Sequence, residues 1–282
     1  YRPVSLVPIL SKIFESVILE QLVAYFEKCG ILYENQYGFR RGKSTTSAVE
    51  CLVTWVLKEF ENKNGALACL CDLSKAFDCV PHDLLLNKLT YYGVNGNELS
   101  VIRSFLSNRE QIVDKGGEWS SAVNVNVGVP QGSILGPFLF IVFVNDLPMS
   151  IPGKIISYAD DTTVLQSLND DNIDVLSILD PMSDWFGANG LCMNVNKTQS
   201  IIFSLSNNEC NLEAVKLLGI WLDNKLSWNR HTDELCKKLS VVIFLLRRLK
   251  QSVSMKILTD AYYSFFHCHL NYGILFWGNS AG

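Results

Sequence analysis

The chain has 282 residues, of which 48% are hydrophobic and 18% are charged, and its formal net charge at pH 7 is −4. This composition supports a sizeable folded core and excludes a disordered or collagen-like polymer. The net charge argues mildly against non-specific binding to nucleic acid, although the local distribution of charge matters more than the sum. The first residue is Tyr1 rather than Met, so we expect a fragment of a longer protein. No basic and apolar leader opens the sequence, and its longest apolar run is too short to span a bilayer, so we expect no contact with a membrane.

The cysteines are odd in number, nine in all, and no pair has the C-x-x-C spacing. A disulfide framework and a four-cysteine zinc site are therefore not expected, and we interpret the free thiols as a sign of a reducing, intracellular compartment. His267, Cys268 and His269 resemble metal ligands. Alternate residues on a helix point in different directions, and no fourth ligand is near, so we expect core and surface roles for them.

Two helices are predicted at the start of the chain. Apolar residues recur at helical spacing over 13–26, which indicates an amphipathic helix. A polar and basic loop follows. A second helix is then predicted over 45–60, with Ser44 or Ser47 as its N-cap.

The middle of the chain mixes strands with helices. Residues 66–71 are apolar throughout and end abruptly at Asp72, which indicates a buried strand. A helix with proline in its first turn is predicted over 81–92. Small polar and β-branched residues alternate over 123–129, as in a strand, and the apolar stretch 134–147 is predicted to be a buried helix.

The last part of the chain changes from strands to helices. Residues 154–166 are predicted to form two short strands, and 173–189 a helix despite an internal proline. Strand patterns follow over 201–205 and 215–222, and two helical patterns occupy 230–266. This order predicts an α+β catalytic body with a C-terminal helical lobe.

Three aspartates stand at the ends of predicted strands. Asp72 terminates the strand 66–71, and Asp160 and Asp161 lie side by side at the junction of the next strand pair. Carboxylates about 4 Å apart repel by roughly 4 kcal/mol at an effective dielectric of about 20. Divalent, oxygen-seeking cations such as Mg²⁺ remove that repulsion. The alternative is structural, a turn and a strand-end cap, because Asp is a common turn residue.

Several short blocks surround these aspartates and occur in a fixed order. They are residues 1–6 (YRPVSL), 12–15 (KIFE), 35–44 (NQYGFRRGKS), 72–78 (DLSKAFD), 128–137 (GVPQGSILGP), 158–161 (YADD), 190–198 (GLCMNVNKT) and 218–219 (LG). In these blocks the chain resembles the reverse transcriptase of non-LTR (LINE-like) retrotransposons over nearly its whole length. Each block alone is weak evidence for this family, whereas the complete set in this order is highly specific for it.

The resemblance implies an active site in a polymerase palm. Asp72, Asp160 and Asp161 would hold two Mg²⁺ ions, with Mn²⁺ as a substitute, and the primer 3′-hydroxyl would attack the α-phosphate of a dNTP. Lys197 matches a lysine that would neutralise or protonate the leaving pyrophosphate. By itself it would be an ordinary surface lysine.

The resemblance also implies contacts with the dNTP. Phe77 matches a steric gate that clashes with a 2′-hydroxyl, although without the motif it would be a core aromatic residue. Gln131 could contact the dNTP or the template base pair, or it could bond the loop backbone. Arg40 matches an arginine expected on the triphosphate, whereas Arg41 and Lys43 either touch phosphate or are solvated.

Contacts with primer and hybrid are implied further along the chain. Leu218 and Gly219 match the primer grip, where glycine permits close approach, although a simple turn would also use glycine. Five basic residues could line an RNA–DNA hybrid through salt-sensitive, sequence-blind contacts, or they could form a solvated helix face. These residues are Lys237, Lys238, Arg247, Arg248 and Lys250.

The fold that we predict is a right-hand polymerase of the α+β class. Fingers and a palm with a mixed, mainly antiparallel sheet are expected over residues 1–223, and a helical thumb over 224–282. The expected activity is RNA-directed DNA synthesis, in which a DNA 3′ end is extended on an RNA template with dNTPs during non-LTR retrotransposition. The endonuclease and other domains of the polyprotein are expected outside this sequence. The family implies the nucleus and cytoplasm, and no targeting signal is seen.

Two alternatives share the fold. One is a catalytically inactive, nucleic-acid-binding remnant or recruited scaffold, which the retained aspartates, Gln131 and Phe77 oppose. The other is an RNA-dependent RNA polymerase, which has the same paired-aspartate palm and which Phe77 also opposes.

Overall fold

The computed structural model describes residues 5–168, 175–205 and 214–280. Contacts between residues divide the chain into two compact units, each built from three segments. The first unit consists of residues 1–43, 69–164 and 174–198, and the second of residues 44–68, 165–173 and 199–282. The predicted domain boundary at residue 223 stays a prediction.

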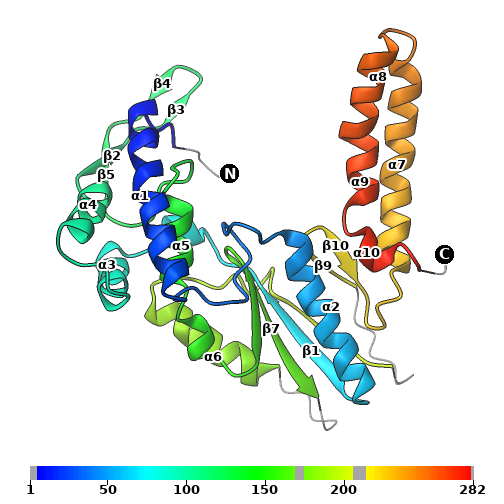
Figure 1. Ribbon diagram of the computed structural model, residues 1–282, viewed down its shortest axis with the longest axis horizontal. Helices are drawn as coiled ribbons and strands as arrows, with labels where there is room; N and C mark the ends of the chain where they lie inside the picture. Colours follow the sequence, from blue (N-terminus) through cyan, green and yellow to red (C-terminus); the bar gives the residue numbers. More distant parts are fainter. Residues whose placement is uncertain (1–4, 169–174, 206–213, 281–282) are drawn as a thin grey trace. The chain divides into compact units, whose positions relative to one another are not determined.

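A four-stranded sheet has the strand order β6-β7-β1-β8 (Figure 1). Its strands are β1 (Gly65–Cys71), β6 (Lys154–Tyr158), β7 (Asp161–Leu168) and β8 (Gln199–Phe203). The residues from Ala66 to Cys69 are at most 1% exposed, as expected for a strand that is covered on both faces. The strands predicted over 66–71 and 154–166 are confirmed, and β7 continues beyond its predicted end. The strand predicted over 201–205 is present but begins and ends two residues earlier.

The first unit contains four of the five helices predicted before residue 190, all but the one over 45–60, together with α4, which was not predicted. These are α1 (Ile9–Lys28), α3 (His82–Tyr91), α4 (Gly96–Leu106), α5 (Gly136–Phe143) and α6 (Leu176–Ala188), with 3₁₀ turns at Ala76–Asp78 and Leu147–Met149. Every residue of α5 except Pro137 is buried, so this helix forms a core. α5 is shorter than the predicted helix 134–147, because a separate 3₁₀ turn follows it. No element was predicted where α4 lies, and residues 173–174 of the predicted helix 173–189 fall outside the described residues.

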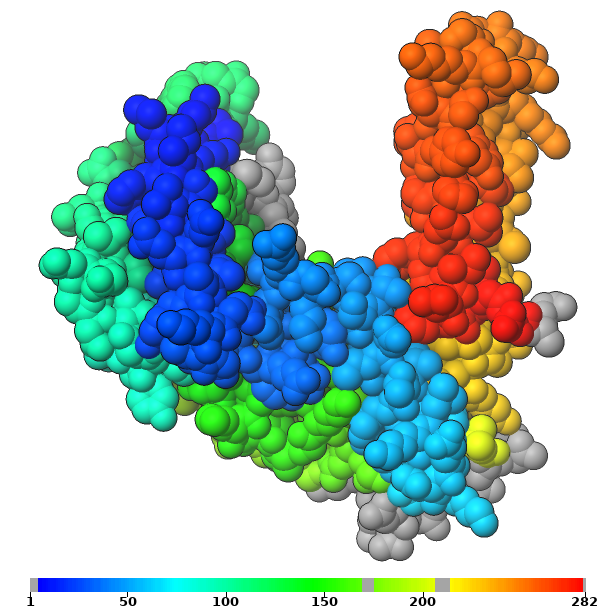
Figure 2. Space-filling view, viewed as in Figure 1, coloured from blue at the N-terminus to red at the C-terminus, as the bar shows by residue number. Residues whose placement is uncertain are grey.

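The apolar stripe predicted for α1 is buried only in the second half of the helix, where Leu22 and Phe26 are 7% and 0% exposed. The helix lies on the surface of its unit (Figure 2), and Ile13 and Val17 of the predicted apolar face are 58% and 50% exposed. Glu15 is instead only 1% exposed. The physical reason is a set of hydrogen bonds: Glu15 Oε2 accepts from the backbone N–H groups of Ile134 and Leu135 at 2.8 and 3.1 Å. A carboxylate is favourable there, because α5 begins directly after these residues.

Two short antiparallel ladders complete the first unit. β2 (Arg109–Gln111) pairs with β5 (Val123–Val125), and β3 (Asp114–Lys115) pairs with β4 (Glu118–Trp119). The strand predicted over 123–129 is therefore confined to three residues. Beyond β5, the chain no longer pairs with β2. Gly128 N instead donates to Val80 O at 2.8 Å.

The second unit begins with α2 (Thr45–Glu61), which confirms the helix predicted over 45–60. Ser44 is its N-cap, because Ser44 Oγ accepts a hydrogen bond from Ser47 N at 3.0 Å. The strand pattern predicted over 215–222 is divided into β9 (Val215–Leu217) and β10 (Ile220–Leu222), which pair antiparallel.

Helices form the rest of the second unit. They are α7 (Asn229–Leu249), α8 (Met255–Tyr262), a π-helical turn at Tyr263–His267, α9 (Cys268–Asn271) and α10 (Ile274–Trp277). α7 and α8 lie side by side (Figure 1), as expected from the two helical patterns over 230–266. Among the described residues, no helix is both long enough and apolar enough to cross a membrane.

The eight cysteines that the structure describes are free thiols. Cys69 and Cys71 are buried in β1, and burial raises the pKa of the Cys69 thiol to about 11 and that of the Cys71 thiol to about 12. Both thiols are therefore protonated at neutral pH and act as small apolar side chains rather than as nucleophiles.

Candidate active site

The three predicted aspartates lie at neighbouring strand ends. Asp72 directly follows β1, and Asp160 and Asp161 lie at the start of β7, the strand beside β1 in the sheet. The start of β1 meets the end of β7, because Asn64 Nδ2 lies 3.4 Å from Ser167 Oγ and a Cβ at Gly65 would lie 3.4 Å from Leu168 Cβ. Since β1 and β7 are neighbours in the sheet, a contact between the start of one and the end of the other means that they run antiparallel. Counting residue for residue from that contact brings the end of β1 level with the start of β7. The three aspartates thus belong to one end of one strand pair.

The donor set at this strand end has the chemistry that Mg²⁺ prefers. Asp72 and Asp160 are half-buried and Asp161 is exposed. Among the described residues, no three Asp, Glu, His or Cys side chains gather closely enough to hold a metal ion by themselves. Mg²⁺ usually takes one or two carboxylates and completes its shell with water and substrate phosphates. Partly exposed carboxylates at one strand end therefore fit an ion that arrives with a nucleotide.

Lys197 contacts the first of these aspartates. Its Nζ lies 3.3 Å from Asp72 Oδ2, and its side chain is 66% exposed. A backbone hydrogen bond holds the loop of Lys197 beside Asp72, because Asn194 of that loop donates its N–H to the Asp72 carbonyl at 2.8 Å. An exposed ion pair contributes at most about 1 kcal/mol. The ammonium group can therefore exchange the carboxylate for a phosphate at little cost.

The ring of Phe77 is fixed by two other aromatic rings. It stacks on Phe140, with ring centroids 4.4 Å apart, and meets Phe39 edge-on at 6.1 Å. Phe140 is fully buried in α5, whereas Phe39 is 53% exposed. Phe77 is itself half-buried, so part of its ring can meet a ligand.

Gln131 is held against the same 3₁₀ turn. Its Nε2 donates to Asp78 Oδ1 at 2.8 Å. The adjoining backbone is also held, because Val129 N donates to Phe77 O at 2.7 Å. A Cβ at Gly128 would lie 2.7 Å from Asp78 O, and Gly128 has a φ of +86°, so only glycine fits there. The fold thus brings Phe77 and Gln131 together.

Arg40 is already paired within the protein. Its Nη2 lies 2.9 and 3.0 Å from the two carboxylate oxygens of Glu27, and its Nη1 donates to Tyr33 O at 2.8 Å. The Arg40 side chain is only 11% exposed. To reach a triphosphate it would have to leave Glu27, whereas Arg41 is exposed already.

Three polar residues around the site were not singled out from the sequence. Gln36 Oε1 accepts from Ala159 N, Glu15 supports the start of α5, and Asp78 holds Gln131. All three lie inside the blocks 12–15, 35–44 and 72–78. Membership in those blocks was the only signal that could have identified them.

Leu218 and Gly219 form the turn between β9 and β10 in the second unit. Both have a positive φ, +46° and +91°. Tyr272 Oη donates to Leu218 O at 2.5 Å, which holds the turn from one side. Gly219 is exposed, so another backbone can approach it closely.

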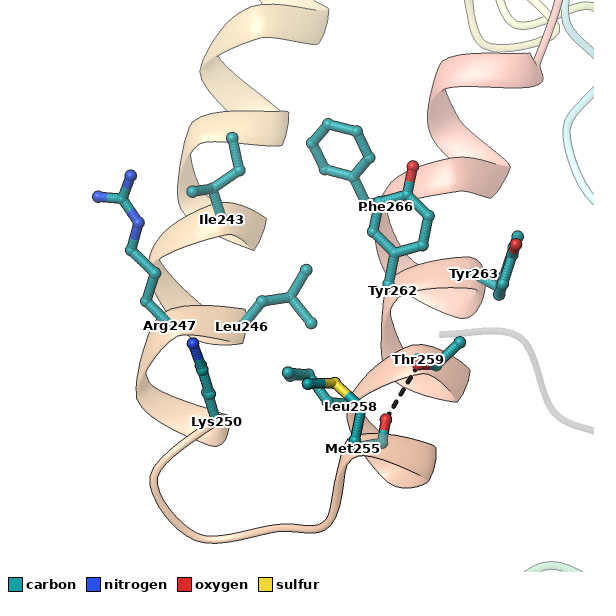
Figure 3. Close-up of a pocket in the computed structure, with 10 residues that line it drawn as sticks. All are labelled: Ile243, Leu246, Arg247, Lys250, Met255, Leu258, Thr259, Tyr262, Tyr263 and Phe266. Atoms are coloured by element: carbon teal, nitrogen blue, oxygen red, sulfur yellow. Dashed lines mark hydrogen bonds between the residues drawn. The ribbon is translucent and has the colours of Figure 1, made fainter.

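The five basic residues predicted to line a hybrid are all exposed, on α7 or directly after it. Lys237 Nζ pairs with Glu234 at 2.8 Å, and Lys238 Nζ lies 3.5 Å from His269 Nδ1. Arg247 borders a largely apolar hollow of about 450 Å³ between α7 and α8, which Figure 3 shows. His267 and His269 contact different neighbours. His267 Nε2 lies 2.8 Å from Asn271 Nδ2, whereas His269 Nδ1 lies near the Lys238 ammonium group.

Solved structures with this architecture are right-hand polymerases. Telomerase from Candida albicans, solved with a fragment of telomeric RNA, matches 96% of this chain with a TM-score of 0.59 at 12% sequence identity, over 53% of its own length. Telomerase from Candida tropicalis, also solved with a fragment of telomeric RNA, matches 96% of this chain with a TM-score of 0.57 at 13% identity, over 47% of its own length. At such identity the likeness shows the fold, which confirms the predicted α+β right-hand polymerase class.

The sequence assigns the chain within that class. The family described as "Reverse transcriptase (RNA-dependent DNA polymerase)" matches residues 1–222, so the chain belongs to the reverse transcriptase family. It is 32% identical over its full length to the "Probable RNA-directed DNA polymerase from transposon BS" of Drosophila melanogaster. Over 82% of its length it is 34% identical to the "RNA-directed DNA polymerase from mobile element jockey" of the same species. These relatives come from non-LTR retrotransposons, which confirms the resemblance, and the chain spans 34% and 28% of their lengths.

Proposed function

We propose that this chain is the polymerase domain of a non-LTR retrotransposon protein and extends a DNA 3′ end on an RNA template with dNTPs. The observation that carries the proposal is the antiparallel arrangement of β1 and β7, in which Asp72 shares a strand end with Asp160 and Asp161. Membership of the reverse transcriptase family supports the same reaction. Two-metal phosphoryl transfer needs ligands that hold the ions where the nucleotide phosphates meet the primer, and carboxylates are such ligands.

In this proposal the three aspartates bind two Mg²⁺ ions, which Mn²⁺ can replace. Once bound, the ions would stabilise the attacking and leaving oxygens of an in-line displacement. The protein holds the carboxylates at one strand end, where their mutual repulsion favours cations. Lys197 leaves Asp72 and neutralises the departing pyrophosphate, an exchange that its 66% exposure supports.

Phe77, Gln131 and Arg40 are proposed to bind the dNTP. Phe77, stacked on a buried ring, stands against the sugar and clashes with a 2′-hydroxyl. Gln131, oriented by Asp78, meets the nucleotide or the template base pair. Arg40 exchanges Glu27 for the triphosphate, which replaces one anionic partner of its planar guanidinium with another.

Template and primer are proposed to lie against both predicted domains, the fingers and palm over 1–223 and the thumb over 224–282. The turn at Leu218 and Gly219 acts as the primer grip, supported by the exposure of the glycine. The exposed basic residues of α7 contact phosphates of the hybrid. The nick that supplies the primer comes from an endonuclease domain outside this sequence.

Primer extension on a poly(rA)/oligo(dT) hybrid tests the proposal. The chain should incorporate dTTP when Mg²⁺ is present, and chelation of the metal should stop incorporation. Asp160→Asn should abolish incorporation and leave hybrid binding nearly intact, because affinity for the hybrid resides in phosphate contacts. Asp180→Asn, at an exposed position of α6, is the matched control and should behave as the wild type.

Two results would contradict the proposal. A wild-type chain that binds the hybrid and incorporates no nucleotide would be the inactive remnant. A chain that uses rNTPs but not dNTPs would be an RNA polymerase.

A further inference from the structure

Gln36 is a buried polar residue with no assigned role in the proposed reaction. It is 4% exposed, and its Oε1 accepts two backbone N–H groups, from Gly38 at 2.8 Å and from Ala159 at 3.0 Å. Ala159 belongs to the turn between β6 and β7 and directly precedes Asp160. One amide side chain therefore joins the loop 35–44 to the turn that carries the aspartates.

The backbone beside Gln36 makes the same connection. Tyr37 N donates to Ser157 O at 2.7 Å, and Ser157 N donates to Asn35 O at 3.0 Å. A Cβ at Gly38 would collide with the backbone N of Ala159, so the loop and the turn are in direct contact there. The loop is thus fixed to the end of β6 on both sides of Gln36.

The turn itself has a conformation that needs support. Ala159 has a φ of +57°, in the left-handed region that residues other than glycine rarely adopt. It is also only 6% exposed, so its N–H cannot turn to bulk water if the acceptor is removed. Because Gln36 accepts that N–H, loss of its side chain would favour rotation of the peptide that leads into Asp160.

We propose that Gln36 is a positioning residue, which sets the affinity of Asp160 and Asp161 for the divalent ion by holding the turn in its left-handed conformation. The inference rests on the proposed function, because it takes these aspartates as metal ligands. Some residues do not bind the metal themselves but orient the residues that do. Mutation of such a residue typically lowers the metal affinity by about 10- to 100-fold. The expected effect of removing the Gln36 amide is a loss of about tenfold in metal affinity.

The test measures Mn²⁺ binding by the decrease of the free-ion electron paramagnetic resonance signal. The full chain is loaded with a poly(rA)/oligo(dT) hybrid whose primer is chain-terminated and with dTTP, so binding is measured without turnover. Gln36→Met removes the acceptor and keeps the length of the side chain, and should weaken Mn²⁺ binding about tenfold. Gln36→Glu keeps an oxygen acceptor and should therefore retain most of the wild-type affinity for Mn²⁺.

Asn145→Leu is the matched control, because Asn145 makes a similar bridge within the same unit. Its Oδ1 accepts from Tyr33 N at 2.7 Å, and its Nδ2 donates to Ile31 O at 2.9 Å, with no bond to the turn. This variant should lose thermal stability to a similar extent and bind Mn²⁺ as the wild type does. A purely structural role for Gln36 predicts the same behaviour for Gln36→Met, with lower stability and unchanged Mn²⁺ affinity, and that result would overturn the inference.

A second variant keeps the inference testable if Gln36→Met fails to fold. Gly38→Ala pushes on Ala159 N from the same loop and should also weaken Mn²⁺ binding, whereas wild-type affinity would count against the inference. Failure of the proposed function is a different result. A wild-type chain that extends no primer contradicts the polymerase, whereas equal Mn²⁺ binding by the wild type and Gln36→Met, with extension intact, contradicts only the role of Gln36.

Discussion

Glu15 is a single carboxylate that holds the start of α5, the helix that follows the Gln131 loop. It is 1% exposed and accepts the N–H groups of Ile134 and Leu135. We predict that Glu15→Leu destabilises the chain by about 2–4 kcal/mol, because each buried N–H left without an acceptor costs about 1–3 kcal/mol. Glu15→Gln keeps an acceptor and should cost less. Urea denaturation measures both, with the exposed Glu20→Gln as control.

That prediction has a clear counter-result. If Glu15→Leu is as stable as Glu20→Gln, the two backbone N–H groups find other partners, and Glu15 does not support the helix.

The position of Phe77 predicts sugar discrimination. Its ring is held between Phe140 and Phe39, so it cannot easily move aside for a 2′-hydroxyl. Phe77→Val should therefore raise the ratio of rUTP to dTTP incorporation by at least about tenfold, which corresponds to about 1.4 kcal/mol of lost discrimination. Single-nucleotide extension measures the ratio, with Tyr91→Val at an exposed ring as control. An unchanged ratio would mean that Phe77 is only a core aromatic residue.

The blocks of the sequence identified the aspartates, Phe77 and Gln131, but not the partners that hold them. Lys197 contacts Asp72 across 125 positions of the chain, and Gln36 contacts Ala159 across 123. Nothing in the local pattern encodes such pairs, because they depend on which strands become neighbours in the sheet. The pairing of Arg40 with Glu27 escaped prediction because it depends on how the loop after α1 folds back on the end of that helix.

Among the elements, the base of α7 contains a buried histidine. His231 is 7% exposed, and its Nδ1 lies 3.4 Å from Trp221 N, which donates to it. Its Nε2 has no hydrogen-bond partner within the described part of the chain. Burial, with a smaller contribution from the charge of Lys216, lowers the pKa of His231 below its ordinary value of 6.5. The folded protein therefore keeps this ring neutral to a lower pH than the unfolded chain does.

This shift predicts how stability depends on pH. The unfolded chain binds a proton near pH 6.5 that the folded chain excludes, so stability is complete above that pH and falls as the pH drops below it. The loss is at most about 1.4 kcal/mol per pH unit from this one group. His231→Gln keeps an acceptor and should remove the dependence. Tryptophan-monitored denaturation at about pH 7.5 and about pH 5.5 compares the two chains, and equal slopes would contradict the prediction.

Elements with a strong local pattern were predicted well. The strand over 66–71 was clear because its apolar run stops at Asp72, and α2 was clear because a serine cap precedes it. The apolar stripe of α1 is buried at Leu22 and Phe26 but exposed in the first half of the helix, because periodicity finds an apolar stripe but not the partner that each turn will meet. The interruption of the 215–222 pattern depends on the positive φ of Leu218, a conformation that its residue type does not suggest.

For the molecule as a whole, we predict that the chain binds the hybrid with an affinity that depends on salt. Arg247 and Arg248 are exposed in the last turn of α7. If each binds one phosphate, the double variant Arg247→Ala, Arg248→Ala should weaken hybrid binding and reduce the slope of log affinity against log salt by about 2. Fluorescence anisotropy over a salt series measures the slope. An unchanged slope would assign these arginines to a solvated helix face.

Asp72, Asp160 and Asp161 are proposed to share one divalent-ion site, and iron-directed cleavage tests this most directly. Fe²⁺ replaces Mg²⁺ in the chain bound to the hybrid and dTTP, and hydrogen peroxide with ascorbate is added. The bound Fe²⁺ reduces the peroxide to hydroxyl radicals, which cut the nearest backbone, and mass spectrometry locates the cuts. We predict cuts near residue 72 and near residues 160–161 together, and the loss of both sets in either Asp72→Asn or Asp160→Asn. Cuts at only one of the two segments, or cuts at one that survive mutation of the other, would contradict a shared site.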